Sequence, residues 1–381
     1  MTTNRLALGI VVVLLAWPVA TSAVCQARVV GNTFVISGCD AVVVQSGDVK
    51  VASGNLVVQN GTNNTATANG KGNVVIGYNA TRGPHKDKRG GSHNLVVGDK
   101  QNYASYGGIV GGYQNEISGK YATAAGGAES TASGDFSAVV GGRANQAQAG
   151  YTAVLGGNEN IASSAAAADP SSPSYSAVAG GAGNQALGAS SAVSGGAGNT
   201  ASGMYASVSG GNGDEASGNA AWVSGGQNNH ASGELASVSG GNKNEASGPL
   251  SSVSGGQSNV ASQHAASVTG GYLNEAAGVY ASVAAGEENR ATGQSASVGG
   301  GRANVASQRN SVAVGGHDNG ATGGTSVVVG GSWNEAIGPS STVTEGSQNV
   351  ASGTDSSVSG GELRTASGAS DWRAGTLFQD N

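Results

Sequence analysis

The chain has 381 residues, enough for two or three ordinary domains, but its composition argues against a conventional globule. Gly accounts for 68 residues and charged residues for only 10%, against about a quarter in typical domains. Three Phe, four Trp and two Met cannot fill a wide core, so we expect thin sheets of small residues lying close together. The net charge of −6 gives no reason to expect nucleic acid or an anionic membrane as a partner.

The N-terminus has the three parts of an export signal. Arg5 supplies a positive charge, residues 6–17 form an apolar run, and Thr21-Ser22-Ala23 is a small-residue cleavage site. The run is short for a membrane span. We therefore predict a signal peptide at residues 1–23 and an exported mature chain, extracellular or at the cell surface in association with an outer membrane. A retained anchor is the alternative.

The mature chain keeps two cysteines, Cys25 and Cys39. In an oxidising compartment, two cysteines with no other partner are expected to join. The loop that they close is short, so chain entropy makes such a disulfide worth about 3 kcal/mol. We predict this bond as a staple at the N-terminal end of the mature fold.

The rest of the chain is dominated by a repeat of 15 residues, marked by a recurring Gly pair such as Gly210-Gly211. The step is broken once, by nine extra residues around positions 164–173. Across 17 units, Val stands two residues before the pair in 14, Asn three residues after it in 14, and Ala five residues after it in 16. The exceptions are Ile109, Ala124 and Ala313 in the Val column, Ser130, Asp214 and Arg364 in the Asn column, and Ile117 in the Ala column.

These columns predict two short strands in each unit. In residues 236–250, Ala236 and Val238 share one face, Asn244, Ala246 and Gly248 share another, and the residues between them point outward. The Gly pair makes the corner between the strands. The predicted fold class is an all-β parallel β-solenoid of about 17 regular coils stacked about 4.8 Å apart. The stacked Asn side chains are expected to form an amide ladder, with an ordinary turn preference as the alternative.

Less regular coils precede the repeat. Apolar runs at residues 41–44, 56–58, 74–76 and 95–97 each follow Asp or Asn, and a solenoid needs a cap over its open edge. We predict four parts: the signal peptide 1–23, an N-terminal cap with irregular coils 24–95, the repeat 96–368 and a C-terminal tail 369–381.

The repeat has a family resemblance. The unit Asn310-Ser-Val-Ala-Val-Gly-Gly and the pattern Asn-x-Ala-x-Gly resemble the head repeats of trimeric autotransporter adhesins of the YadA-like type. The resemblance covers residues 73–368 and implies a left-handed parallel β-roll, a homotrimer, and adhesion at a bacterial surface to a host or matrix protein or a glycan. The step is one residue longer than the family's usual repeat. No segment resembles the family's stalk or membrane anchor, so we expect no integral membrane anchor in the mature chain.

Two other functions stay open. Gly256-x-x-Asn259-x-Ala261 matches the middle of a curli-subunit repeat, without its flanking Gln residues. A self-assembling, functional amyloid-like fibre subunit is therefore the main alternative. Regular outward hydroxyls, as at Ser237 and Ser239, would suit an ice-binding surface, although such surfaces favour rows of Thr and the Thr residues here are scattered.

No residue constellation indicates catalysis, a cofactor or a metal. The five His residues are not spaced with Cys or carboxylates as metal ligands. Residues 181–186 imitate a dinucleotide-binding fingerprint but belong to the repeat, with no helix after them. We therefore predict a non-enzymatic protein without cofactor or metal. Arg82, Lys86, Lys88 and Arg89 are interpreted as a solvated basic loop, with anion or glycan binding as the alternative.

One column, which we call the corner stripe, gathers large apolar side chains three residues before the Val position. It consists of Tyr121, Phe136, Tyr151, Tyr175, Tyr205, Leu235, Leu250 and Tyr280. The stripe is interpreted as a packing seam or as a platform for sugar rings or a partner protein. A core of Ala, Val and Gly buries little apolar area, so we predict a homotrimer that the stripe helps to seal.

Overall fold

The computed structural model describes residues 26–30, 33–37, 55–164 and 174–374. The chain divides into two units, residues 1–57 and residues 58–381. The predicted signal peptide, Cys25, Cys39 and the apolar run at residues 41–44 lie outside the described residues, so the predictions made for them stay predictions.

The first unit contains an antiparallel hairpin that the sequence did not lead us to expect. Strand β1 (Gln26–Val30) pairs with β2 (Thr33–Ser37), with Gln26 opposite Ser37 and Val30 opposite Thr33. The coil predicted at residues 56–58 is wrong, because this segment forms no strand. Leu56 and Val57 are 73% and 69% exposed.

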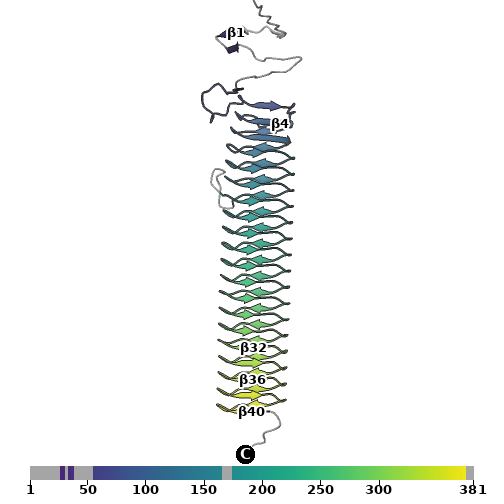
Figure 1. Ribbon diagram of the computed structural model, residues 1–381, viewed down its shortest axis with the longest axis vertical. Helices are drawn as coiled ribbons and strands as arrows, with labels where there is room; N and C mark the ends of the chain where they lie inside the picture. The colour runs from purple at the N-terminus through teal and green to yellow at the C-terminus, as the bar shows by residue number, and fades with distance from the viewer. Residues whose placement is uncertain (1–25, 31–32, 38–54, 165–173, 375–381) are drawn as a thin grey trace, which may run out of the picture. The chain divides into compact units, whose positions relative to one another are not determined.

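The second unit confirms the predicted parallel β-solenoid. Each coil gives one short strand to each of two parallel sheets, and about 18 coils follow one another along the axis (Figure 1). We name the sheets after the columns that they bury, the Val sheet and the Ala sheet. The Val sheet contains β3 (Val74–Ile76), β4 (Leu95–Asp99), β6 (Ile109–Tyr113), β8 (Thr123–Ala124), β10 (Ala138–Val139), β12 (Ala153–Val154), β14 (Ala177–Val178), β16 (Ala192–Val193), β18 (Ser207–Val208), β20 (Trp222–Val223), β22 (Ser237–Val238), β24 (Ser252–Val253), β26 (Ser267–Val268), β28 (Ser282–Val283), β30 (Ser297–Val298), β32 (Val312–Val314), β34 (Val327–Val329), β36 (Thr342–Thr344), β38 (Ser357–Ser359) and β40 (Trp372–Ala374). The Ala sheet contains β5 (Asn102–Tyr103), β7 (Glu116–Ile117), β9 (Thr131–Ala132), β11 (Gln146–Ala147), β13 (Ile161–Ala162), β15 (Gln185–Ala186), β17 (Thr200–Ala201), β19 (Glu215–Ala216), β21 (His230–Ala231), β23 (Glu245–Ala246), β25 (Val260–Ala261), β27 (Glu275–Ala276), β29 (Arg290–Ala291), β31 (Val305–Ala306), β33 (Gly320–Ala321), β35 (Glu335–Ala336), β37 (Val350–Ala351) and β39 (Thr365–Ala366).

The strands pair in register, so that like stacks on like as predicted. Val238 pairs with Val223 and Val253 in the Val sheet, and Ala246 pairs with Ala231 in the Ala sheet. The nine extra residues around position 169 leave this register intact, because Val154 pairs directly with Val178. Among the described strands, β3 pairs only with β4 and β40 only with β38, so each is an edge strand.

The core is one continuous column of small side chains. Val238, Ala236 and Ala246 are each no more than 1% exposed, and the same holds for their counterparts in most coils. The outward positions between them are partly or fully exposed, as period-two alternation requires. The predicted inward and outward faces of both strands are therefore confirmed.

The first coil shows where counting from the Gly pair was wrong. Ile109 was assigned to the Val column, but Val110 pairs with Ala124 and is fully buried, whereas Ile109 is 44% exposed. Because this coil has one residue fewer between its buried Val and its second Gly, the strand step from Val110 to Ala124 is 14 residues. Val96 pairs with Val110 at the same 14-residue step.

In a typical pair such as Gly255-Gly256, only the second Gly is structurally required. At Gly256 the backbone has φ 86°, and a Cβ would collide with the carbonyl oxygen of Gly271. Its neighbour Gly255 has open space where a Cβ would stand. This explains why the first position tolerates Ala285 and Glu345.

Each coil also has two corners at which a residue other than Gly often adopts the left-handed conformation. One follows the Gly pair, as at Lys243 (φ 54°), and the other is the corner stripe, as at Leu250 (φ 59°). All eight stripe residues have φ between 54° and 61°. This conformation costs a side-chain-bearing residue about 1–2 kcal/mol.

The predicted Asn ladder is present, but its bonding differs from the prediction. The backbone N–H of Asn259 donates to Oδ1 of Asn244 at 3.0 Å. Nδ2 of Asn244 donates to the carbonyl oxygens of Gly240 (2.8 Å) and Gly256 (2.9 Å). Each amide therefore bonds to backbone rather than to the next amide. The reason is that the corner buries one N–H and two carbonyls that need partners.

Candidate functional site

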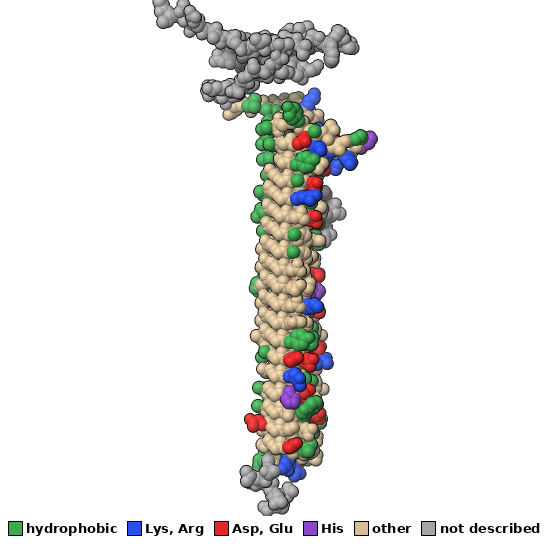
Figure 2. Space-filling model, turned by 90° about the vertical axis from the view of Figure 1, so that its right-hand side faces the viewer, with side chains coloured by type: hydrophobic (Ala, Val, Ile, Leu, Met, Phe, Trp, Pro, Cys, Tyr) green, Lys and Arg blue, Asp and Glu red, His purple; other side chains and the backbone are tan. Residues whose placement is uncertain are grey.

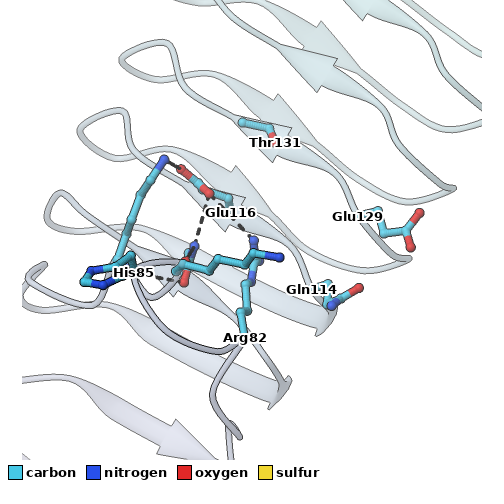
Figure 3. Close-up of a pocket in the computed structure, with 9 residues that line it drawn as sticks. Arg82, His85, Gln114, Glu116, Glu129 and Thr131 are labelled. Atoms are coloured by element: carbon cyan, nitrogen blue, oxygen red, sulfur yellow. Dashed lines mark hydrogen bonds and ion pairs between the residues drawn. The ribbon is translucent and has the colours of Figure 1, made fainter.

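Three surface features of the solenoid could support a function, and the first is a cavity beside the segment between β3 and β4. Figure 3 shows Arg82, His85, Gln114, Glu116, Glu129 and Thr131 around it. The cavity has a volume of about 560 Å³ and is also lined by Lys86, Lys88 and Asn102. The loop is fixed to the coils by Arg82, whose Nε donates to the carbonyl of Lys100 and whose Nη2 donates to that of Asn115, both at 2.7 Å.

Glu116 is the centre of the polar network in this cavity. Nζ of Lys88 donates to it at 2.7 Å, Nδ2 of Asn102 donates to it at 3.2 Å, and Nη1 of Arg82 lies 3.7 Å away. Burial alone would raise the pKa of Glu116, but the hydrogen bonds from Lys88 and Asn102 and the charges of Lys88 and Arg82 lower it below its usual value. Burial also lowers the pKa of Arg82.

This network corrects the interpretation of the basic loop as simply solvated. Arg82 and Lys88 are paired with Glu116, and Arg89 lies 3.4 Å from Asp87, so three of the four cations have acidic partners. The side chain of Arg82 is only 16% exposed. A further anion would meet the carboxylates of Glu116 and Glu129 on the cavity wall. The cavity is best explained as an ion-paired brace that holds a long loop on the solenoid.

The second feature is the corner stripe, whose eight members are all exposed, from 43% at Tyr121 to 62% at Tyr205. Rings from successive coils stack at centroid distances of 5.2 Å (Tyr121 and Phe136), 5.0 Å (Phe136 and Tyr151) and 5.3 Å (Tyr151 and Tyr175). The structure therefore brings the first four residues together. Ser190, Ala220 and Ala265 interrupt the later part of the stripe at the same corner, where only Leu235 and Leu250 lie in successive coils.

The third feature is the outer face of the Val sheet, which sequence analysis did not single out. Its outward positions are the residues on either side of the buried Val, such as Ser237 and Ser239. From Val74 to Ala374, none of these positions in the described coils carries a charge. In contrast, the outward positions of the Ala sheet include Glu116, Glu215, His230, Glu245, Glu275, Arg290 and Glu335. Figure 2 shows most of the charged side chains along one margin of the solenoid, where hydrophobic ones also lie, while the opposite margin carries mainly hydrophobic and uncharged side chains.

The uncharged face also changes in character along the axis. Leu95, Ile109, Val140 and Leu155 project from it near its N-terminal end, and each is 36–56% exposed. Ser residues take over in the middle, as at Ser237. The face could have been found from the sequence by aligning the outward columns, because its signal is the absence of charge rather than any motif.

No protein-family model and no curated protein matches the chain. Its function must therefore be inferred from its own geometry. The described residues contain no helix that is long and apolar enough to cross a membrane.

The described residues also contain side chains of the kinds that can bind metal ions, and histidines with acidic neighbours. No group of three His, Cys, Asp or Glu side chains among them could hold a metal ion. His230 lies 3.8 Å from Glu215 and 2.9 Å from the hydroxyl of Ser217. His317 lies 3.1 Å from Asp318, and its ring is edge-on to that of Trp333. What the arrangement provides is extended surface, in the form of a flat uncharged face and a stack of aromatic rings at its corner.

Proposed function

We propose that the chain is an exported, non-enzymatic structural or adhesive protein of the cell surface and that it acts as a homotrimer. The observation that carries the proposal is the outer face of the Val sheet, on which the two positions that flank the Val column carry no charge in any of the 20 described strands. An exposed face that bears no charge over such a length is typical of a surface that contacts another protein. The predicted export signal supports the location at the cell surface, and the resemblance to adhesin heads supports the homotrimer.

The size of this face suits self-association. About 18 coils at roughly 4.8 Å each, with a width of about 10 Å across the outward positions, give roughly 850 Å² for each chain. A standard specific interface buries about 800 Å² for each partner. We place the main contact between chains on this face rather than on the corner stripe, because the stripe is interrupted at Ser190, Ala220 and Ala265.

The mass of the purified mature protein in solution tests the proposal, with three chains as the expected result. Replacing Ser237, Ser252 and Ser267 together by Glu places charge on the uncharged face and should dissociate the trimer, because like charges would be buried against each other. The matched control replaces Ser232, Ser247 and Ser262 by Glu on the outer face of the Ala sheet. These three lie near Glu245, so repulsion within one chain is at least as large in the control.

Two results would overturn the trimer on this face. One is a monomeric wild-type protein, and the other is a trimer that both triple variants retain. Large, polydisperse assemblies of the wild type that bind amyloid dyes would instead favour the fibre subunit, in which the edge strands β3 and β40 would pair between copies.

A further inference from the structure

Of the three interruptions of the corner stripe, the one at Ser190 has a tyrosine on each side. Tyr175 and Tyr205 occupy the same corner two coils apart, with Ser190 between them. The backbone N–H of Ser190 donates to the carbonyl of Ser174 (2.6 Å), and that of Tyr205 donates to the carbonyl of Ala189 (2.9 Å), so the three coils are stacked without a break. Ser190 thus stands where a further ring would continue the stack.

The ring faces on either side of this gap are open. Tyr121, Phe136 and Tyr151, which have a ring on both sides, are 43%, 48% and 44% exposed. Tyr175 and Tyr205 rise to 60% and 62%. The higher exposure fits the smaller number of ring neighbours among the described residues, which is one for Tyr175 and none for Tyr205.

The width of the gap selects the kind of guest. Two coil steps give about 10 Å between the ring planes. Contacts on both faces at the usual carbon–carbon distance of about 3.5–4.0 Å take up roughly 7–8 Å. A flat aromatic ring in the middle of the gap would lie about 5 Å from each tyrosine ring, which is the spacing of the rings that stack in successive coils (5.0–5.3 Å). A puckered six-membered ring is thicker, because its hydrogens project on both faces, so it would contact both tyrosine rings more closely.

The surroundings select the polarity of the guest. Ser190 is partly exposed, and its hydroxyl has no hydrogen-bond partner among the described residues. A ligand in this gap therefore needs apolar faces and a polar edge. A sugar ring has both, because its C–H groups lie on its faces and its hydroxyl groups lie around its edge. Between residues 174 and 213 the chain has no charged residue, so nothing near the gap would balance an anionic sugar or a nucleotide.

We propose that Tyr175, Ser190 and Tyr205 form a binding slot for a neutral pyranose ring of a surface or matrix glycan. The tyrosine rings cover its two faces, and the Ser190 hydroxyl bonds to its edge. This inference deepens the adhesive role proposed above and rests on it, because the slot must face solvent in the assembled protein.

The proposal is tested most directly by a substitution that fills the slot with a side chain of the protein itself. Ser190→Tyr should complete the stack without disturbing the backbone, because Ser190 has φ 57° and Tyr already adopts φ 54° and 58° at positions 175 and 205. The matched control is Ser340→Tyr at the same corner, where the neighbours Thr325 and Asp355 provide no ring. Tyr205→Ala opens the slot instead.

The probes are the methyl glycosides of glucose, galactose, mannose and N-acetylglucosamine, with p-cresol as a mimic of a partner's tyrosine, followed by saturation-transfer NMR and titration. We expect at least one glycoside to bind, and its affinity to fall at least tenfold in Ser190→Tyr and in Tyr205→Ala but not in Ser340→Tyr. Binding of none of the four, undiminished binding to Ser190→Tyr, or binding of p-cresol alone would overturn the proposal, and the last result would indicate a protein partner.

The mass of each variant in solution separates this inference from the proposed function. A wild-type monomer that binds the glycoside through the slot would refute the trimer and leave the slot standing. A trimer that Ser190→Tyr dissociates would place the slot inside the contact between chains and overturn the glycan proposal alone.

Discussion

The Asn ladder has one acidic member, Asp214, and replacing it by Asn should stabilise the protein at neutral pH. At the equivalent position, Nδ2 of Asn199 donates to the carbonyls of Gly195 (2.8 Å) and Gly211 (3.0 Å). In Asp214 an acceptor, Oδ2, takes the place of this donor, and it is buried without a partner. Asp214→Asn should restore two hydrogen bonds of about 1 kcal/mol each and remove an unsatisfied buried acceptor that costs about 1–3 kcal/mol. We expect a gain of about 3–5 kcal/mol.

The dependence on pH distinguishes this explanation from a general effect of the substitution. Burial raises the pKa of Asp214, although hydrogen bonds from the backbone and side chain of Asn229 offset part of the rise. A carboxyl group whose pKa is higher in the folded state stabilises the fold fully below its unfolded pKa, and this contribution is lost as the pH rises through the folded pKa. The advantage of Asp214→Asn should therefore be small near pH 3.5 and grow towards pH 7. All other carboxyl groups are common to both proteins and cancel in the comparison.

Thermal and urea unfolding at several pH values measure the difference between the two proteins. Hydrogen exchange of the coils around residues 199–229 shows whether the gain is local, as expected in a solenoid whose coils contact only their neighbours. The reverse substitution Asn244→Asp, in an intact part of the ladder, should cause a loss of similar size. An advantage of Asp214→Asn that does not change with pH, or an Asn244→Asp variant as stable as the wild type, would refute the reasoning.

The remaining predictions concern the corners, the staple and the insertion. Gly256→Ala should cost about 3 kcal/mol through positive φ and a backbone clash, while Gly255→Ala should cost less than about 1 kcal/mol, and equal losses in urea unfolding would contradict this. Thiol labelling of the non-reduced mature protein should find neither Cys25 nor Cys39 reactive. Deleting residues 165–173 should leave the melting temperature within a few degrees, because β12 and β14 already pair in register across the insertion. Replacing Tyr151, Tyr175 and Tyr205 together by Ser should lower thermal stability through lost ring stacking, and loss of trimer in the same variant would show that the stripe belongs to the seam.

The repeating part of the fold could be predicted because its signal is positional. Val238, Ala246 and Asn244 recur at one period, and alternation alone assigns each to the inside. The hairpin at residues 26–37 lies outside any period, and its antiparallel pairing has no counterpart in the repeat. The sequence positions were counted from the Gly pair, which assigned Ile109 instead of Val110 to the buried column. The count failed because this coil is one residue shorter between its buried Val and its second Gly.

The candidate sites were less accessible to sequence reasoning, because they depend on which columns become neighbours. The ion pairs of Arg82 and Lys88 with Glu116 join residues about thirty positions apart, through a loop that follows no repeat. The uncharged face becomes visible only when 20 strands are aligned on their outward positions. In both cases the decisive information is long-range, and short motifs do not carry it.

Ring stacking offsets the backbone strain of some residues of the corner stripe, but not that of Tyr205. Each stripe residue bears about 1–2 kcal/mol of left-handed strain, and a residue such as Asn310 meets the same corner at lower cost. From Tyr121 to Tyr175, three stacked ring pairs return about 0.5–1.5 kcal/mol each, and Tyr280 has the His264 ring 5.4 Å away. Tyr205 bears the same strain with no ring partner among the described residues, and its exposure is the highest of the stripe at 62%. Leu235 and Leu250 have the same conformation without a ring partner, so strain alone does not distinguish Tyr205. Its high exposure and its place opposite Tyr175 across Ser190 do, and an external contact with both tyrosine rings would explain why an exposed ring is kept at this corner.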